Sequence, residues 1–523
     1  MYSHSLRRIC RIGYYFVPLT FGLRYSHSEN CEYICIFARL IVSLQPLKIN
    51  SVSKKQQLLT MVRDGAVMSR GDKLSLVLWL SMPAIFGQLS TIVMQYIDTM
   101  MVGQLGANAT ASIGLVSTTC WLFGGLGASI SAGFSVLVAQ YIGAKEYDNA
   151  RDTLRQSVLV CMGLGLLISL FCVSIHSWWP HALGGTPEVA ALSSKYFLVW
   201  SLTVPVMQLL FLSNGMLRSS GNMKTPMLLG IMMCGLDVVF NLLLIPLWGV
   251  VGAALATTIS AVITTACSFS YLIMRSPELR LTGDNYSPFT LHPSLIRRSL
   301  KIGLPMAVEH VVFCGAQIVS TMIVAPLGAV AIAANTIGVV VESLCYMPGY
   351  GIGDAATTLV GQSYGARRLD LIRDFSILTV LLGMAVMTLL GIVMYLAAPQ
   401  LMQMMTPDLA VQAEGITALR IEAFAEPMYA ASIVAYGVFM GLGDTLIPCI
   451  MNLGSIWLVR IPLAAILART MGLRGVWLAM CLELTVRGVI FLLRLRFKKI
   501  KVKKPESPEN PDNPDNPEIL ECL

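Results

Sequence analysis

The two halves of this chain repeat each other at a fixed offset of 222 residues, and this internal repeat constrains the fold more than any other feature. Residue pairs that keep the offset include Pro83 with Pro305, Gln140 with Gln362, Gly143 with Gly365, Gly221 with Gly443, and Pro226 with Pro448. One inserted residue then shifts the match to 223, where Gly249 meets Gly472. Both halves are apolar. Weakly similar apolar halves are typical of secondary transporters, which rock one repeat against the other around a central site.

The chain is too apolar for a soluble protein of its length. Of its 523 residues, 55% are hydrophobic and 13% charged, and the mean hydropathy is +0.69. A helix of about 20 apolar residues crosses the ~30 Å core of a bilayer. Apolar runs of this kind predict twelve spans, at 76–101, 111–139, 154–176, 193–213, 226–247, 249–274, 299–325, 333–361, 374–397, 416–440, 446–468 and 472–494. The predicted fold is therefore an all-α integral membrane protein with twelve transmembrane helices in two pseudo-symmetric six-helix lobes.

Each half has an even number of predicted spans, so the halves should be parallel, related by an axis along the membrane normal. Basic residues of the short loops set the orientation, because they favour the cytoplasmic side. Most lie on one side, from Lys145 and Arg151 through Arg218 and Arg367 to the run that starts at Arg494. We therefore expect both termini in the cytoplasm and the chain in the inner (plasma) membrane. The net charge of +8 follows from this topology and requires no nucleic-acid partner.

The sequence predicts five regions. Residues 1–72 form an N-terminal extension, 73–275 the N-lobe, 276–298 a cytoplasmic linker and 299–495 the C-lobe. Residues 496–523 are first basic and then rich in Pro, Asn and Asp, a composition typical of a disordered tail. Residues 1–70 have no counterpart in the second half, and we interpret the start as mis-assigned, with translation beginning at Met61 or Met68. The thirteen cysteines show no metal-binding spacing, so we expect no metal and no cofactor.

Short motifs recur at the ends of the predicted spans. They are Asp98–Gly103 after the first span, Gln140-x-x-Gly143-Ala144 after the second, Arg218-Ser-Ser-Gly221-Asn222 after the fourth, and, in the second half, Gln362-x-x-Gly365-Ala366 and Gly441-Leu-Gly443-Asp444. In their order and spacing, residues 73–495 resemble the multidrug and toxic compound extrusion (MATE) family, bacterial type. The resemblance implies two six-helix lobes in a V that export organic cations or drugs in exchange for protons or sodium.

The resemblance also implies roles for particular acids. Asp98 is similar to the helix-1 carboxylate that proton-linked members use, and Asp237 to a helix-5 aspartate that partners it. In that branch an asparagine often stands one turn before the helix-5 aspartate, where this chain has Met233. Glu309 is similar to the helix-7 acid of other bacterial members. A helix-10 aspartate of sodium-linked members is missing, with Glu426 about one turn away, so protons and sodium both remain candidate coupling ions.

Comparison of the two halves separates shared positions from asymmetric ones. Glycine, proline and glutamine positions that both halves share should serve the repeated fold. Acids present in one half only are better candidates for function: Asp98 stands opposite Ser320, Asp237 opposite Val459, Glu309 opposite Gly87, Glu342 opposite Cys120 and Glu426 opposite Val204. An ionisable group in a membrane costs at least about 2.5 kcal/mol on insertion scales, so it needs a partner, a polar cavity or a task.

We therefore predict that Asp98, Asp237 and Glu309 couple transport to proton or cation binding. Gln95, Asn214, Thr257, Glu342 and Glu426 are candidate cavity-lining residues. Structural roles compete with each assignment: Asp98 could cap a helix end, Asp237 could bond a neighbouring helix, and Glu309 could satisfy groups freed by Pro305. For Asp354 a packing or hinge role is as good an interpretation. Glu483 and Arg487, four residues apart, predict an intrahelical ion pair, and Arg460 stays unassigned.

The leading functional prediction is a cation-coupled antiporter for cationic small molecules that works by alternating access in the lipid bilayer, with a monomer as the default. The alternative within transport is a lipid-linked oligosaccharide flippase of the same architecture. A flippase would need a basic cavity for pyrophosphate, whereas these spans hold more acids than bases. An enzyme is not expected, since the six histidines are scattered and form no constellation with Asp or Ser.

Overall fold

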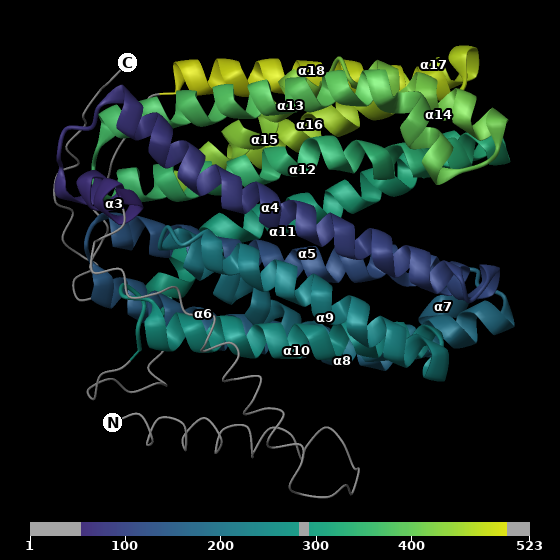
Figure 1. Cartoon of the computed structure of the whole chain (residues 1–523), viewed down its shortest axis with the longest axis horizontal. Helices are drawn as coiled ribbons and strands as arrows, with labels where there is room; N and C mark the ends of the chain where they lie inside the picture. Colours follow the sequence, from purple (N-terminus) through teal and green to yellow (C-terminus); the bar gives the residue numbers. More distant parts are fainter. Residues whose placement is uncertain (1–53, 282–291, 499–523) are drawn as a thin grey trace, which may run out of the picture. The chain divides into compact units, whose positions relative to one another are not determined.

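The structure is a computed structural model, and it describes residues 54–281 and 292–498. Predictions for residues 1–53, for residues 282–291 of the linker and for the Pro-rich tail fall outside the described residues. Residues 57–281 and 292–498 belong to one compact unit, to which the following description refers. Every regular element in this described part is a helix, which confirms the predicted all-α class (Figure 1).

The helices of the first half follow the short helix α3 (Lys54–Asp64). They are α4 (Arg70–Gly103), α5 (Ala107–Gly143), α6 (Tyr147–Ile175), α7 (Trp179–Ala182), α8 (Pro187–Ser219), α9 (Lys224–Trp248) and α10 (Val250–Arg275). The second half has α11 (Pro293–Val324), η1 (Ala325–Leu327), α12 (Ala329–Gly365), α13 (Leu369–Met405), α14 (Leu409–Glu422), α15 (Glu426–Gly441), α16 (Leu446–Ser455), η2 (Ile456–Arg460), α17 (Ile461–Met471) and α18 (Leu473–Phe497).

Eleven described segments are long and apolar enough to cross a membrane, and α14 with α15 would make a twelfth. Most of the observed helices run a few residues beyond the predicted apolar windows, into the polar residues that flank them. At the start of α4, for example, Ser69 and Asp72 form a reciprocal capping box. Two spans are less regular than predicted. The tenth bends by 60° between α14 and α15, and a π-helical turn, η2, interrupts the eleventh.

The helices form two lobes, as predicted: the N-lobe helices α4 to α10 and the C-lobe helices α11 to α18 (Figure 1). Within the N-lobe, α8 packs against α5, α6 and α10, and α9 packs against α4 and α10. Within the C-lobe, α12 packs against α13 and α15. The lobes also exchange contacts, since α4 lies along α12 and α5 along α11. The first helix of each half thus packs on the second helix of the other half.

The second helices of the two halves meet at one end of the bundle, at their last turns. A Cβ atom on Gly143 would lie 2.0 Å from the carbonyl oxygen of Gln362, and one on Gly365 would lie 1.8 Å from that of Gln140. Only glycine permits this approach. We call this contact the seam, and the end of the bundle that carries it the seam end. The loops at 144–146, 220–223, 366–368 and 442–445 lie there.

Candidate functional site

Two predicted coupling acids come together in the N-lobe. Asp98 lies on α4, five residues before the helix ends at Gly103, and Asp237 lies midway along α9. Their carboxyl groups contact each other. Asn241, one turn after Asp237 on the same face of α9, joins them. Its amide nitrogen donates to Asp98 Oδ1 at 2.8 Å and to Asp237 Oδ2 at 2.9 Å.

The three side chains differ in their access to solvent. Asp237 is 0% exposed and Asn241 1% exposed, whereas Asp98 is half-buried. Asp237 Oδ1 and Asn241 Oδ1 are buried without a hydrogen-bond partner. Buried polar atoms are normally paired, so this cluster has unused capacity to accept a proton or a hydrogen bond. Asp98 is its accessible member.

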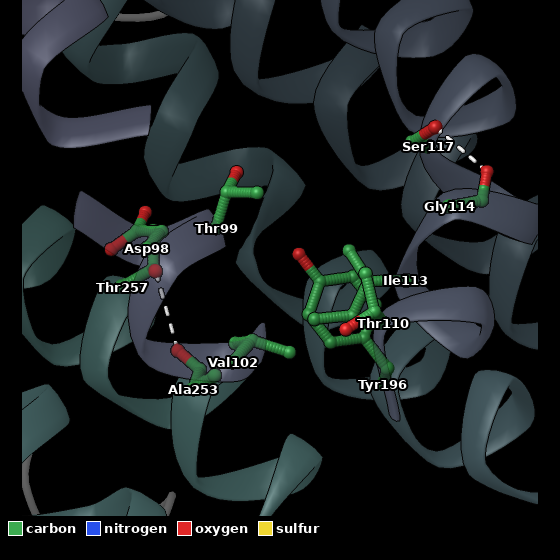
Figure 2. Close-up of a pocket in the computed structure, with 10 residues that line it drawn as sticks. All are labelled: Asp98, Thr99, Val102, Thr110, Ile113, Gly114, Ser117, Tyr196, Ala253 and Thr257. Carbon is green, nitrogen blue, oxygen red and sulfur yellow. Dashed lines mark hydrogen bonds between the residues drawn. The ribbon is translucent and has the colours of Figure 1, made fainter. Parts of the chain in front are cut away.

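Asp98 reaches the wall of a cavity of about 270 Å³ in the N-lobe (Figure 2). Residues of α4, α5, α8 and α10 line it: Asp98, Thr99, Val102, Thr110, Ile113, Gly114, Ser117, Tyr196, Ala253 and Thr257. The lining mixes hydroxyl groups, one aromatic ring and apolar side chains around a single carboxylate. A few polar groups in an otherwise apolar wall suit an organic ligand, and the one charge selects for a cation.

Glu309 lies in the C-lobe, and its hydrogen-bond partners all belong to that lobe. Its carboxylate accepts from the Tyr436 hydroxyl at 2.7 Å and from the Asn452 amide nitrogen at 2.6 Å. Both oxygens of the half-buried carboxylate are thus held by side chains of α15 and α16. The structure therefore gives Glu309 a separate site from that of Asp98 and Asp237.

The other two acidic candidates, Glu342 and Glu426, lie deep in the C-lobe. They are 5% and 0% exposed, and both Glu426 oxygens lack a hydrogen-bond partner. Glu422, one turn earlier, is equally buried and also has two unpaired oxygens. The three carboxyl groups lie within electrostatic range of one another, and those of Glu342 and Glu422 also of Arg460. Two of these acids flank the bend between α14 and α15: Glu422 ends α14 and Glu426 begins α15.

Of the remaining candidates, Thr257 lies at the N-lobe cavity, whereas Asn214 and Gln95 do not line it. Thr257 lines the cavity beside Asp98. Asn214 does not reach the acids, because its side-chain oxygen accepts from Ser268 of α10 at 3.0 Å. Gln95 is exposed and is not among the lining residues.

Four charged residues that the sequence left with structural or no roles have partners. Glu483 and Arg487 form the predicted intrahelical pair, with Arg487 Nε 2.9 Å from Glu483 Oε1. Asp354 makes an ion pair between the lobes, 3.2 Å from Nη1 of Arg218, and accepts from Gln88 of α4 at 3.1 Å. This supports a packing role for Asp354. Arg460 lies on η2 and faces the buried C-lobe acids.

The sequence interpretation missed Asn241, Tyr196 and Glu422. Asn241 had a signal, because an asparagine was sought one turn before Asp237 and one stands one turn after it. Glu422 and Glu426 also stand four residues apart in an apolar segment, a spacing that places both on one helix face. Tyr196 had no signal, since one tyrosine in a predicted span is unremarkable.

Comparisons with known proteins identify the family and the fold of the chain. A family model described as MatE matches residues 83–243 and again 305–466, one match in each half. A "Probable multidrug resistance protein NorM" of Thermotoga maritima is 28% identical over 79% of this chain and 90% of that protein. A protein of the same description from Brucella suis is 27% identical over 82% of this chain and 93% of its own.

Solved structures share the fold. One is the outward-facing conformation of a multidrug resistance MATE family transporter of the MOP superfamily, with a TM-score of 0.78 and 23% identity over 86% of this chain and 98% of that chain. Another, of MATE in the bent conformation, has a TM-score of 0.75 at 22% identity over 86% of this chain and 97% of that one. The two-lobe helical architecture is therefore shared with these transporters.

Proposed function

Because the chain belongs to the MatE family, the multidrug and toxic compound extrusion transporters, we propose that it exports organic cations in exchange for protons or sodium. The membrane-spanning helices and the transporter relatives agree with a non-enzymatic, multi-pass membrane protein. The single observation that carries the coupling proposal is the contact of Asp98, Asn241 and Asp237 at the wall of the N-lobe cavity.

The pair of acids supplies the coupling. Asn241 holds the carboxyl groups of Asp98 and Asp237 close together, and we propose that they share one proton, because two adjacent carboxylates repel each other when both are ionised. A cationic ligand beside Asp98 stabilises the fully ionised pair and expels that proton. Proton and substrate then compete for one site, which is the minimum requirement for antiport. Asn241 keeps the two carboxylates in register by donating to both.

Alternating access uses the repeat. The lobes contact each other through repeat-related helices, α4 on α12 and α5 on α11, so a rocking motion can exchange equivalent contacts. Protonation of the acid pair would bend or repack α4, which carries Asp98 at one end and contacts α12 along its length. The substrate would then leave toward the outer side.

Glu309 is the proposed acid of the C-lobe. Tyr436 and Asn452 hold its carboxylate in a fixed orientation, as a second coupling site would require. If sodium drives transport, Glu309 is the alternative coupling site, because hard cations take oxygen ligands and the side chains of Glu309, Tyr436 and Asn452 each carry oxygen.

A lipid-linked oligosaccharide flippase is the second candidate, and the cavity disfavours it. A pyrophosphate needs basic residues, whereas the residues that line this cavity include the acid Asp98 and no lysine or arginine. We further propose that the protein lies in the inner (plasma) membrane as a monomer, with both termini in the cytoplasm. In this orientation the basic seam end faces the cytoplasm.

Dye transport in inside-out vesicles tests the proposal. Uptake of a fluorescent cationic dye is measured with a pH gradient and then a sodium gradient, for the wild type, Asp98→Asn and Glu309→Gln. Proton-driven uptake that falls at least about tenfold in Asp98→Asn, but persists in the exposed control Asp148→Asn, would support the N-lobe mechanism.

Other outcomes separate the alternatives. Sodium-driven uptake that survives Asp98→Asn but not Glu309→Gln would move the coupling site to the C-lobe. If neither gradient moves the dye in the wild type, the antiport proposal is wrong, and translocation of a lipid-linked oligosaccharide becomes the next assay.

A further inference from the structure

The short helix α3 has no role in the transport proposal. It precedes residue 83, where the family match begins, and the internal repeat gives it no counterpart in the second half. Its residues from 57 onward nevertheless pack within the transporter unit. This helix therefore packs at the seam end although it lies outside the repeated fold.

Arg63 of α3 contacts both lobes at once. Its Nε donates to the side-chain oxygen of Gln362 in the C-lobe at 3.3 Å. Its other two nitrogens donate to the carboxylate of Glu278, just after the N-lobe, at 3.0 Å and to the carbonyl oxygen of Ser220 in the N-lobe at 3.3 Å. The side chain is only 6% exposed. A planar guanidinium group can make these three contacts together because its donors point in fixed, divergent directions.

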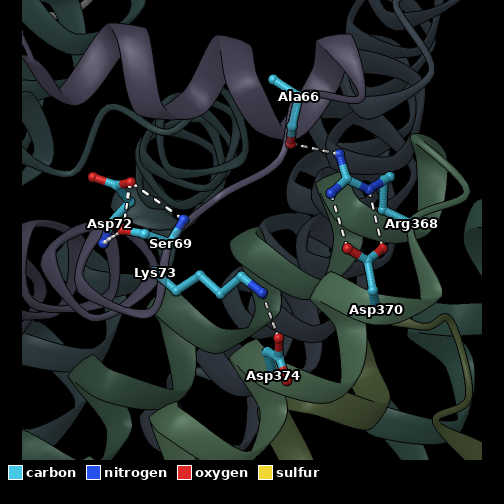
Figure 3. Close-up of polar contacts among 7 residues, drawn as sticks. All are labelled: Ala66, Ser69, Asp72, Lys73, Arg368, Asp370 and Asp374. Carbon is cyan, nitrogen blue, oxygen red and sulfur yellow. Dashed lines mark hydrogen bonds and ion pairs between the residues drawn. The ribbon is translucent and has the colours of Figure 1, made fainter.

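The residues that follow Arg63 repeat this division. Asp64 forms an ion pair of 2.5 Å with Lys145, in the N-lobe loop between α5 and α6. The carbonyl oxygen of Ala66 accepts from Arg368 of the C-lobe at 3.1 Å (Figure 3). Asp370 holds Arg368 in place through two hydrogen bonds, which raise the pKa of Arg368. The segment 63–66 is therefore tied to each lobe by charged groups.

Apolar contacts support the same arrangement. Leu58, Leu59 and Val62 are 3%, 5% and 0% exposed, and they join a cluster built mainly from C-lobe residues. Leu59 also fills the space beside the N-lobe turn at Gly221, where an added Cβ would lie 2.7 Å from its Cδ1. One face of α3 is thus buried against both lobes.

We propose that α3 is a strap that holds the two lobes together at the seam end and must release before that end can open. The proposal rests on the alternating-access function above. Gln362 connects α3 to the seam, because the side chain that accepts from Arg63 also donates to Ser219 in the other lobe. Opening that separates the two lobes at the seam would have to break the Arg63 contacts on at least one side.

Hydrogen–deuterium exchange of the full chain in lipid nanodiscs tests the strap. The variants are Arg63→Ala, Arg63→Lys, a truncation that begins at Met68, and the control Arg151→Ala, which loses only a pair with exposed Asp148 at the same end. In Arg63→Ala and in the truncation, peptides covering 219–223 and 362–368 should exchange about tenfold faster. Arg63→Lys should show a smaller increase than Arg63→Ala, because lysine keeps the positive charge but lacks the divergent donors of the guanidinium group.

The comparison between the two ends of the bundle decides the result. Loops at the opposite end, at 183–187 and 406–409, should keep wild-type exchange in every variant. Unchanged exchange at the seam in Arg63→Ala and in the truncation would overturn the proposal, and so would an equal increase at both ends.

Dye transport, measured in parallel, separates this proposal from the function it rests on. Faster seam exchange in a protein that moves no dye under either gradient would support the strap and defeat the antiport proposal. Active transport with identical seam exchange in all variants would defeat the strap alone.

Discussion

Gln140 and Gln362 occupy equivalent positions in the two halves, and each donates a hydrogen bond to the end of a helix in the opposite lobe. Gln140 Nε2 lies 3.0 Å from the carbonyl oxygen of Gly441, the last residue of α15. Gln362 Nε2 lies 2.7 Å from that of Ser219, the last residue of α8. Gly441 and Ser219 are themselves separated by the repeat offset. The seam is therefore a symmetric exchange of contacts between the lobes.

Replacing either glutamine should weaken the seam. Gln140→Leu and Gln362→Leu each leave a carbonyl oxygen without its donor in a buried place, which costs about 1–3 kcal/mol. Gln362→Leu should be the more severe, because this side chain also accepts from Arg63. Thermal unfolding of the purified protein in detergent measures the loss of stability in each variant. Gln403→Leu, at an exposed position of α13, is the control. Equal melting temperatures for all variants would show that these bonds carry no net stability.

The glycine pair at the seam predicts a steric effect. Gly365→Ala places a methyl group 1.8 Å from the carbonyl oxygen of Gln140, so α5 and α12 must move apart. Overpacking of this kind costs about 1–3 kcal/mol. We expect faster hydrogen exchange at the ends of both helices and a lower melting temperature. Gly454→Ala, where nothing lies within 4 Å of the added atom, should behave like the wild type. Two indistinguishable alanine variants would contradict the seam geometry.

Much of this fold was predictable because the repeat is a global signal. Apolar windows located the spans, and positions shared by both halves, such as Gln140 with Gln362 and Gly143 with Gly365, proved to be structural contacts between the lobes. What the sequence could not reveal is that these contacts cross from one lobe to the other. A repeat identifies equivalent residues but not which copy each one contacts.

The site was predictable only in part. The asymmetry between the halves selected Asp98 and Asp237, whose carboxyl groups do contact each other. Asn241 was missed because its role depends on how α4 crosses α9, a tertiary relationship that its spacing from Asp237 does not reveal. In the C-lobe, Glu422 lies near Glu342 and Glu426 beside the bend between α14 and α15. The sequence predicted one span at 416–440 there, and it could not show that Glu342 of another helix lies near these two acids.

Asn241 should be needed for coupling. Asn241→Leu removes the donor that Asp98 and Asp237 share, while keeping a side chain that branches at the same carbon. Without that donor the two carboxyl groups lose their fixed geometry, and we expect proton-driven dye transport to fall at least about tenfold. The half-maximal pH of transport should also move, which a purely structural defect would not cause.

Asn214→Leu is the matched control for this substitution, because the Asn214 side chain bonds Ser268 and neither of the two acids. Its transport should stay within about twofold of the wild type. Equal losses in both variants would indicate a general packing defect in the N-lobe, and full activity of Asn241→Leu would exclude the proposed bridge.

Asp444 predicts a pH dependence of stability at the seam end. It lies in the loop between α15 and α16 and pairs with Lys498 and with Arg494, the latter at 2.5 Å. Partial burial opposes ionisation of the carboxyl group, but the hydrogen bonds and charges of Lys498 and Arg494 outweigh it and lower the pKa of Asp444. An unfolded aspartate has a pKa of about 3.9. The pairing therefore stabilises the fold above about pH 4, and this contribution is lost as the pH falls through the lower, folded value.

Thermal unfolding between pH 7 and pH 3 checks the sign of this effect. At pH 7 Asp444→Asn should be less stable than the wild type by about 1 kcal/mol or less, since the groups are partly solvated. The difference should shrink as the pH falls below 4, because protonation makes the wild-type side chain neutral as well. The control Asp408→Asn, at the opposite end, removes a carboxylate that caps α14 and that forms no ion pair among the described residues. A gap between Asp444→Asn and the wild type that persists or widens at pH 3 would show that the lysine and arginine charges do not control this carboxylate.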